Sequence, residues 1–429
     1  MFSPSIKKTS VKKAVGAKSP AIADSLALII DIESGLVRAA LVAHVPGRAP
    51  HVLYVVTSPI ISHATATHSG DLLGAMTKSL KEVSGIIANK AMPELRAKGI
   101  TLPIAHIHCA LSSPWIISKT TTVKVDYGKN VQVSKAIITK IVDHEHKELE
   151  KRFRTEHAAA TADASVEYDL EFIEQKIFEI RLNGYPVTHI HGKPAHEIEV
   201  SFAVTVSSKD ILKRIHDAIG SHLNIMSLRG IYGVNGDYVE MFHSSLLLQY
   251  AAFRNLVDVR GDYIAAHVHN NLSDIVVVRR GLCSILASFP FGMADFIKKS
   301  SAALNQSEPL AHSALSMRAH QHLTVESEKT VANASDPVVR EWASQFFKTL
   351  ASVAGAEGLP RLLVLSVHDH FPYFKQALQD QNDGISLDIT ALDEALLEKA
   401  VTYERGQDTN ALVTMYAFAL NPDYHADLY

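Results

Sequence analysis

Three segments of the chain share one pattern, in which an apolar strand runs into a short polar turn. In segments 26–42 and 263–286 the turn leads into a second apolar strand, whereas in segment 360–378 it leads into a helix. Continuous apolar runs bounded by polar turns predict strands that are buried on both faces. Two similar hairpins lie far apart in 429 residues, which is more than one core usually holds. The sequence therefore predicts an α/β protein with two lobes or more.

The composition indicates a globular protein without a general electrostatic partner. The net charge is −3 and hydrophobic residues make up 47% of the chain, which argues against a nucleic-acid-binding protein and a disordered chain. Cys109 and Cys283 lie far apart in apolar runs, so a reducing cytoplasm is favoured over a disulfide framework. No apolar stretch approaches the roughly 20 residues of a membrane helix. We therefore expect a cytoplasmic protein.

Residues 1–25 have a different character, being rich in Ser, Ala and Lys with no acid before Asp24. This composition predicts a disordered basic arm. A solvated leader is the favoured interpretation. The alternative is attraction to anionic lipid or an acidic partner, worth about 1 kcal/mol per lysine near a membrane.

The alternation of strands and helices predicts the order of the domains. A module with its own strands and a charged helix interrupts lobe 1, and a strand at 197–207 is expected to resume that lobe. In lobe 2, helices are expected at 293–303, 309–322 and 337–355. The predicted boundaries are 1–25 for the basic arm, 26–108 for the first part of lobe 1, 109–196 for the inserted module, 197–258 for the second part of lobe 1, 259–405 for lobe 2, and 406–429 for a C-terminal helix and tail.

This order of elements, together with several short stretches, resembles the FtsA and PilM families of bacterial actin-like proteins. The stretches are ALSSPWIISKT at 110–120, where the chain enters the module, and NGY at 183–185 and GKPA at 192–195, where it leaves. The resemblance spans about 26–420. It implies a two-lobed actin-like fold, the duplicated ribonuclease-H-like architecture, with an inserted module of the 1C (SHS2) type and a reduced, helical subdomain 2B.

The resemblance also implies a function. An FtsA-like chain would be a cytoplasmic scaffold or adaptor at the inner membrane in cell division, which is the favoured interpretation. A PilM-like chain would instead be a cytoplasmic component of a type IV pilus assembly platform. The partner would be a division-ring protein or the tail of a pilus membrane protein. Self-association is left open, and no binding of nucleic acid is expected. On the module, Trp115 and Tyr185 are the predicted partner-binding residues.

The nucleotide loops of actin-like ATPases fall on segments 31–35, 267–274 and 366–370 of this chain. The first segment keeps Asp31 but has Glu33 at the position of the key glycine, the second keeps only its final Asp274, and the third has no glycine. The residues of a degenerate nucleotide site would be Asp31, Ser34, Gly35, Ser273, Asp274 and Ser366.

Loss of these glycines predicts loss of ATP binding. Such loops point backbone N–H groups at phosphates from turns that only glycine adopts at low cost. A carboxylate at Glu33, about 4 Å from a phosphate charge, would add a repulsion of about 4 kcal/mol, or about three decades of affinity. We therefore predict no catalytic residue and no cofactor. Residual ATP and Mg²⁺ binding through Asp31 and Asp274 is the alternative, with ATP-dependent filament formation as its function. A sugar-kinase-like enzyme on the same superfold is less favoured.

Histidine recurs in a His-x-His pattern. On a strand, residues i and i+2 share a face, so such a pair can present two imidazoles to one metal ion. A zinc site built from the last two pairs and Asp31 is conceivable. Spacing without a third ligand is a weak signal, so polar filling of loops is the favoured interpretation and no metal site is predicted. The pairs are His106/His108, His144/His146, His189/His191, His267/His269 and His368/His370.

Overall fold

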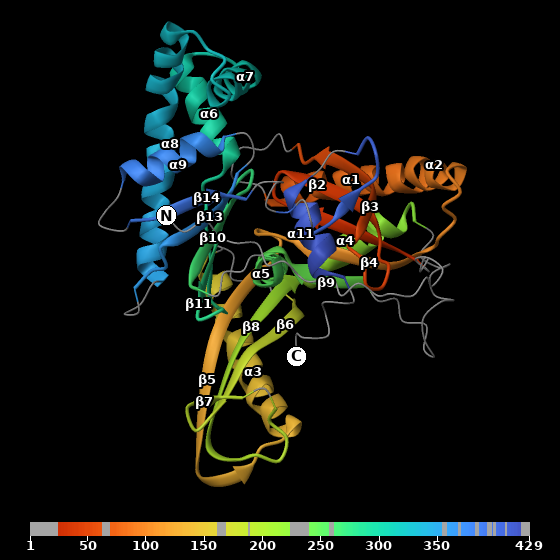
Figure 1. The fold of residues 1–429 in the computed structure, drawn as a ribbon, viewed down its shortest axis with the longest axis vertical. Coiled ribbons are helices and arrows are strands. Elements are labelled where there is room, and N and C mark those ends of the chain that lie inside the picture. The colour runs from red at the N-terminus through yellow and green to blue at the C-terminus, as the bar shows by residue number, and fades with distance from the viewer. Residues whose placement is uncertain are drawn as a thin grey trace, which may run out of the picture.

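The computed structural model consists of two lobes and a projecting module, each built around its own β-sheet (Figure 1). This arrangement confirms the two lobes and the inserted module that the sequence predicts. The structure describes residues 25–61, 69–160, 169–187, 189–223, 240–256, 261–353, 358–367, 370–381, 386–392, 397, 400–407 and 410–421.

The sheet of lobe 1 has six strands, and every residue of its β1 strand (Leu26–Ile32) is buried. Helices cover β1 on both faces, which is why its sequence is a continuous apolar run. Leu28 packs toward α1 (Ser69–Ile86) and α4 (Lys209–Gly220). Ile29 packs on the opposite face toward α5 (Ser245–Leu256) and α11 (Ala411–Ala419). The strand order is β15 (Thr402–Tyr403), β3 (His51–Pro59), β2 (Leu36–Ala43), β1, β4 (Ile104–Leu111) and β9 (Glu240–Ser244). A π-helical turn (Ile87–Ala91) and α2 (Met92–Ala97) extend α1.

The sheet of lobe 2 repeats the central connectivity of lobe 1. In lobe 1, β1 pairs antiparallel with β2 and parallel with β4. In lobe 2, β10 pairs antiparallel with β11 and parallel with β13. The strand order is β12 (Leu282–Phe289), β11 (Ser273–Arg279), β10 (Tyr263–Val268), β13 (Leu362–Ser366) and β14 (Asp388–Ala391). One face carries α6 (Met293–Leu304), α7 (Glu308–Ala319), α8 (Val325–Val353) and α9 (Phe371–Asp380). The expected duplicated architecture is therefore present.

Helices α5 and α11 lie between the two sheets (Figure 1). They share one apolar core with Ile29 and Val52 of lobe 1 and with Val276 and Val364 of lobe 2. The two lobes are therefore joined by a common core as well as by the chain.

The inserted module contains β5 (Ile117–Gln132), α3 (Lys135–Ala160), β6 (Leu170–Leu182), β7 (Tyr185–Pro186) and β8 (Pro194–Ser208), with the strand order β5-β8-β6-β7. Segment 197–207, which we expected in lobe 1, belongs to β8, the strand that pairs with both β5 and β6. The predicted end of the module at residue 196 is therefore wrong. The strand periodicity was clear, but periodicity does not reveal which sheet a strand joins.

Two expectations for lobe 2 also need correction. Helix α8 begins at Val325 and continues through Pro337, where we expected it to start. Burial of Val331, Val338 and Trp342 on one face of α8 offsets the loss of the backbone hydrogen bond that the proline removes.

The second correction concerns the end of lobe 2. Strand β15 pairs with β3 in the sheet of lobe 1, so the chain has returned to lobe 1 by residue 402, before the predicted boundary at 405.

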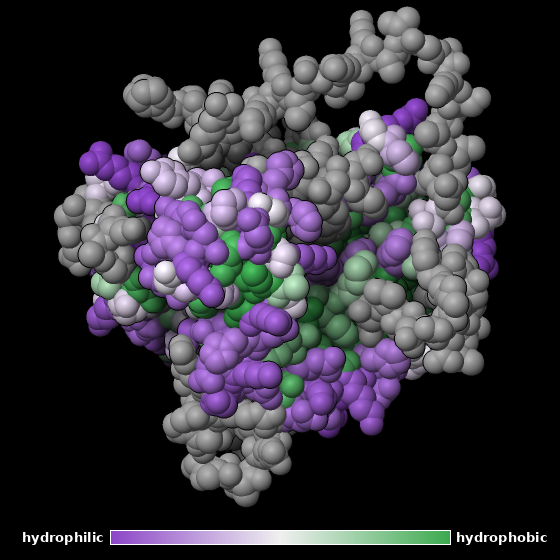
Figure 2. Space-filling view, turned by 90° about the horizontal axis from the view of Figure 1, so that it is seen from below, coloured by the Kyte–Doolittle hydropathy of each residue, from purple (hydrophilic) through white to green (hydrophobic). Residues whose placement is uncertain are grey.

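Some predictions lie outside the described residues, namely the basic arm at 1–24, His368 and Asp369, and the tail at 422–429. Among the helices that the structure does describe, none combines the length and apolarity needed to cross a bilayer. Seen from below, hydrophilic residues surround a group of apolar residues near the middle of the view (Figure 2).

Trp342 provides a test of the packing in lobe 2. Its side chain is fully buried, stacks on Phe346, meets Phe374 edge to face, and donates a hydrogen bond from Nε1 to Ser273 Oγ at 2.8 Å. We expect Trp342→Ala to lower the free energy of unfolding by about 3–5 kcal/mol in urea denaturation followed by circular dichroism. Leu310→Ala, an exposed position on α7, should change it by less than about 0.5 kcal/mol. Equal effects of the two changes would contradict this assignment of the core.

Candidate functional site between the lobes

The turns of the two lobe-opening hairpins touch each other. Each turn is closed in the same way, by a hydrogen bond from Glu33 N to Leu36 O at 3.0 Å and from His269 N to Leu272 O at 2.9 Å. Across the junction, the main-chain N–H of Asn271 donates to Ser34 Oγ at 3.2 Å. The two segments that correspond to the nucleotide loops of actin-like ATPases are therefore in direct contact.

Gly35 allows this close approach, and Gly292 allows a second one within lobe 2, to the main chain of Asn270. A Cβ atom on Gly35 would lie 2.1 Å from Cβ of Asn270, and one on Gly292 would lie 2.4 Å from the carbonyl oxygen of Asn270. Only a residue without a side chain fits in either place. Gly35, the retained small residue of the first loop, here makes room for a side chain of the other lobe.

A chain of polar side chains, buried except for Ser288, crosses the same junction. Arg38 Nη1 lies 2.6 Å from Asp31 Oδ2 and 3.5 Å from Glu33 Oε1. Glu33 Oε2 lies 2.9 Å from His269 Nδ1, and His269 Nε2 lies 2.9 Å from Asp274 Oδ2. Ser288 donates to the other oxygen of Asp274. We call these six residues, Arg38, Asp31, Glu33, His269, Asp274 and Ser288, the interlobe chain.

The interlobe chain concentrates buried charge. In the described part of the protein, the buried Asp, Glu, Lys and Arg residues are Asp31, Glu33, Arg38 and Asp274, and all four belong to this chain. Buried charges are costly unless they are paired. The contact between the lobes therefore contains the side chains whose burial costs the most free energy.

Burial and neighbouring charges shift the protonation of these groups. Burial, and then the negative charge of Glu33, raises the pKa of Asp31 to about 8. Burial alone would lower the pKa of His269, but the charge and hydrogen bonds of Asp274 and Glu33 raise it to about 10. Although burial opposes the change, the close contacts of the two neighbouring histidines and the positive charge of His269 hold the pKa of Glu33 well below its usual range. Burial, and then the positive charge of His269, lowers the pKa of His267 to about 4.

These shifts define the charges at neutral pH. His269 is a cation between two carboxylates, the raised pKa of Asp31 favours its protonated form, and His267 is neutral. A histidine cation that shares its two N–H groups between Glu33 and Asp274 is a charge-assisted link between the lobes.

The structure separates the predicted nucleotide-site residues into two groups. Asp31 and Asp274 belong to the interlobe chain, and Ser34 accepts the bond from Asn271. Ser273, by contrast, donates to the carbonyl oxygen of Phe291 and accepts from Trp342, so it serves the core of lobe 2. Ser366 ends β13, where it is in register with His267 on β10.

The residues present do not fit a triphosphate bound between the two turns. The Asn271 N–H that could face a phosphate is bonded to Ser34, and Asn270 fills the space beside Gly35. The Glu33 carboxylate, 5% exposed, lies in the same junction. Asp31 and Asp274, the residue types that hold Mg²⁺ through water, are bonded to Arg38 and His269 instead.

The two predicted partner-binding residues differ in exposure. Trp115 is 4% exposed, donates from Nε1 to the carbonyl oxygen of Glu33 at 2.9 Å, and is therefore not at a surface, contrary to expectation. The apolar neighbours of lobe 1 bury its ring. Tyr185 is 75% exposed at the turn between β6 and β7, and its role stays a prediction.

Sequence reasoning missed the third member of a possible metal-binding cluster. Glu33, His267 and His269 each offer one ligand atom, and these atoms all lie within 4.8 Å of one another. The sequence suggested His370 and Asp31 as companions of the histidine pair. His370 instead packs against Phe296 and His312 among the helices of lobe 2. The available signal was Glu33 itself, an acid where a phosphate loop requires glycine.

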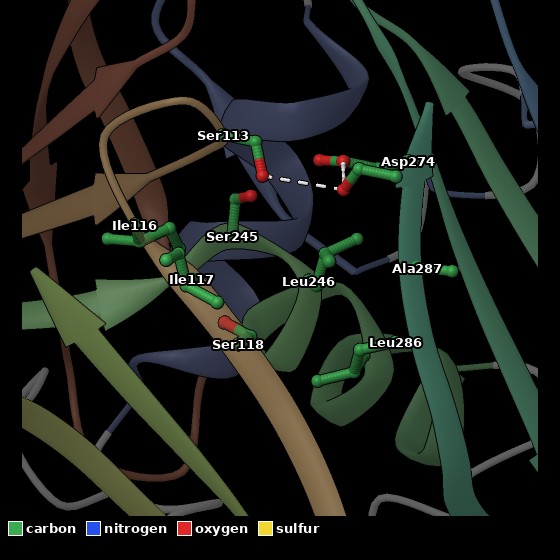
Figure 3. Close-up of a pocket in the computed structure, with 10 residues that line it drawn as sticks. Ser113, Ile116, Ile117, Ser118, Ser245, Leu246, Asp274, Leu286 and Ala287 are labelled. Carbon is green, nitrogen blue, oxygen red and sulfur yellow. Dashed lines mark hydrogen bonds between the residues drawn. The ribbon is translucent and has the colours of Figure 1, made fainter. Parts of the chain in front are cut away.

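A partly open cavity of about 270 Å³ lies at the Asp274 end of the interlobe chain (Figure 3). Ile117 of the module, Leu246 of α5 and Leu286 of β12 line it. Ser113 Oγ lies 3.4 Å from Ser288 Oγ, which leads to Asp274. The cavity therefore gives an approach to the buried chain from the side of the module.

Comparison with solved structures identifies the fold. The chain matches the "PilM-PilN type IV pilus biogenesis complex" with a TM-score of 0.53 and 13% sequence identity, over 93% of this chain and 97% of that chain. The fold is that of the actin-like ATPases. The chain also matches the ethanolamine utilization protein EutJ from Carboxydothermus hydrogenoformans (TM-score 0.42, 8% identity, 94% of this chain and 91% of that chain). A third match is a Bacteroides thetaiotaomicron protein of unknown function with an actin-like ATPase fold (TM-score 0.38, 8% identity, 94% and 99%). No protein-family model and no curated protein matches the sequence.

Gly35 tests the contact between the turns. We expect Gly35→Ala to lower the free energy of unfolding by about 1–3 kcal/mol, because its Cβ would overlap Asn270. The matched control is Gly74→Ala in α1, where a Cβ meets no atom within 4 Å and the change should stabilise by about 0.5–1 kcal/mol. Chemical denaturation of both variants checks the expectation. A Gly35 variant as stable as the Gly74 variant would mean that the turns do not touch.

The interlobe chain also predicts how stability depends on pH. The pKa values of Asp31 and His269 are raised in the folded state, so their stabilising protons are fully present below the unfolded values and are lost as pH rises through about 8 and about 10. We expect the free energy of unfolding in metal-free buffer to fall by roughly 2–4 kcal/mol between pH 7 and pH 9. For Asp31→Asn, the fall in the free energy of unfolding should be smaller than that of the wild type by roughly 1 kcal/mol, since the variant lacks one titrating group. Parallel pH profiles for the two proteins would contradict the proposed proton on Asp31.

Proposed function

We propose that this protein is a PilM-like adaptor that binds a cytoplasmic segment of a membrane protein and does not turn over ATP. The contact between the two hairpin turns carries the proposal, because it puts Asn270 and Asn271 of lobe 2 where a nucleotide would have to lie. The similarity to the PilM–PilN complex over nearly the whole chain supports the adaptor role. The interlobe chain then joins the lobes as a bound nucleotide would in an active ATPase.

A groove between the module and lobe 1 is the proposed partner site. Its volume is about 770 Å³, and its walls come from β6, α4 and β9. Phe172, Leu212 and Met241 provide apolar surface, and Lys213 and Glu171 lie at its exposed rim. Apolar surface bordered by charged groups suits a peptide better than a small polar ligand.

The strands beside the groove favour an extended peptide. In the part of the chain that the structure describes, β6 pairs with β8 along one edge, whereas its other edge is paired only near its C-terminal end, by β7 and Val187. The strand β9 is likewise the last strand in the sheet of lobe 1. Free main-chain groups on such edges bind an added strand. We propose that the tail segment lies along this edge of β6 with its apolar side chains in the groove.

An FtsA-like scaffold in cell division is the second candidate, supported by the sequence where the chain leaves the module. The two candidates differ in the membrane protein whose tail is bound. The same binding experiment can therefore distinguish them.

The test uses labelled synthetic peptides from the cytoplasmic tails of single-pass membrane proteins encoded in the pilus and division loci of the same genome. Fluorescence anisotropy should show saturable binding of one tail, with the same affinity with and without ATP and Mg²⁺. Met241→Glu should weaken it by at least about tenfold, because a charge would be desolvated in the groove. Met317→Glu, on the exposed α7 of the other lobe, is the matched control and should bind like the wild type.

The outcomes separate the functions. Binding of a pilus tail supports the PilM-like adaptor, and binding of a division tail supports the FtsA-like scaffold. Tail binding that requires ATP, or saturable micromolar binding of ATP and Mg²⁺ in calorimetry, would replace the adaptor with a nucleotide-dependent protein. Equal loss in the Met241 and Met317 variants would rule out the groove.

A further inference from the structure

Glu33, His267 and His269 form a set of metal ligands between the lobes. Two imidazoles and one carboxylate are a ligand set that Zn²⁺ uses in proteins. Because all three residues are buried, such a site would be closed to bulk water on most sides. We propose that Glu33, His267 and His269 together bind one Zn²⁺ ion. The proposal does not depend on the adaptor function.

The separations of the ligand atoms suit a small tetrahedral ion. Ligand atoms that each lie about 2.0–2.1 Å from a tetrahedral Zn²⁺ are about 3.3 Å apart from one another. Glu33 Oε2 lies 2.9 Å from His269 Nδ1 and 3.9 Å from His267 Nε2, which brackets that value. The two imidazole rings lie with their centroids 4.0 Å apart. Small rotations of these side chains would place the three ligand atoms at three corners of a tetrahedron around the ion. The fourth corner would be left for a water molecule.

Without a metal ion, the imidazole of His267 lies in an unfavourable environment. Its Nε2 is too far from Glu33 for a hydrogen bond, and its Nδ1 is buried with no partner among the described atoms. A buried imidazole without hydrogen bonds is costly. A metal ion bound by Nε2 gives that nitrogen a partner and explains why a polar residue lies inside an apolar strand.

Asp274 orients the other histidine. It accepts a hydrogen bond from Nε2 of His269, which leaves Nδ1 to face Glu33. A carboxylate on the far nitrogen of a metal-bound histidine fixes the ring and makes it a stronger ligand. Ser288 in turn bonds the free oxygen of Asp274. The cluster thus includes both the ligands and the group that positions one of them.

The fixed charges around the cluster also favour a dication. Three carboxyl groups, those of Asp31, Glu33 and Asp274, share this junction with a single guanidinium, that of Arg38. When all three carboxyl groups are ionised, a divalent cation with neutral histidines balances the junction, where a low local dielectric makes imbalance costly. Zn²⁺ would then replace two protons, the one on Asp31 and the one shared between Glu33 and His269.

The test measures zinc bound to the full-length protein. Metal-free protein, prepared with a chelator, is incubated or refolded with Zn²⁺ and dialysed, and its metal content is measured by inductively coupled plasma mass spectrometry. We expect a single equivalent per chain, a higher melting temperature than the metal-free protein, and intense visible d–d absorption when Co²⁺ replaces Zn²⁺, as a tetrahedral site gives.

Three variants make the result specific. His267→Gln removes a ligand without breaking the link from Glu33 through His269 to Asp274, so it should fold and lose the bound equivalent. Asp274→Asn, which acts through His269, should weaken zinc binding by about 10–100-fold. The matched control is the double change His189→Gln and His191→Gln, an exposed His-x-His pair on the module, which should keep the metal.

The proposal fails if the wild type binds no more zinc than the His267→Gln variant. It also fails if zinc does not raise the melting temperature of the wild type above that of the metal-free protein. It also fails if the double control loses the equivalent while His267→Gln retains it, because the metal would then be a surface ion. In either case the interlobe chain is a hydrogen-bonded link without metal.

Discussion

The need to pair buried charge governs how the two lobes meet. Glu33 of one hairpin and Asp274 of the other are both buried, and each finds its cationic partner in His269. If the lobes moved apart, one carboxylate would lose that partner before water could fully replace it, which is costly in a low-dielectric interior. The closed arrangement of the lobes therefore follows from a pairing requirement, in addition to the apolar core formed by α5 and α11.

This constraint changes what the actin-like fold can do here. Where paired hairpins clasp a nucleotide, bound phosphate supplies the charge that joins the lobes, so closure responds to the ligand. In this chain, side chains supply both signs of charge, and Gly35 lets Asn270 occupy the adjoining space. The contact between the two lobes then does not require the charge of a bound phosphate. In the structure, these side chains join the two lobes directly.

Much of the fold follows from the sequence, whereas the site does not. The buried strands β1 and β10 and their hairpins show in continuous apolar runs, because helices cover both of their faces. Pairing across sheets is different: β8 has the alternation of any strand, and only its partners β5 and β6 place it in the module. The link from Glu33 to His269 joins residues 236 positions apart, a distance over which local periodicity carries no information. The sequence did show that a carboxylate had replaced a loop glycine, but not that it would face a histidine of the other lobe.

Trp115 connects the interlobe chain to the module and shows why a buried residue can matter for a distant surface. Its indole N–H bonds the carbonyl oxygen of Glu33, and its own carbonyl oxygen accepts a hydrogen bond from Ser207 at the end of β8. The first hairpin turn is thus connected to β8, an inner strand of the module's sheet, through Trp115 and two hydrogen bonds. On the other side of that module, Glu174 of β6 accepts the main-chain N–H of Ser244 on β9 at 2.8 Å, beside the groove. Both attachments hold the module against lobe 1 and so fix the position of the groove walls relative to each other. A preformed groove spares a tail peptide the cost of ordering its receptor, which favours binding that needs no other ligand.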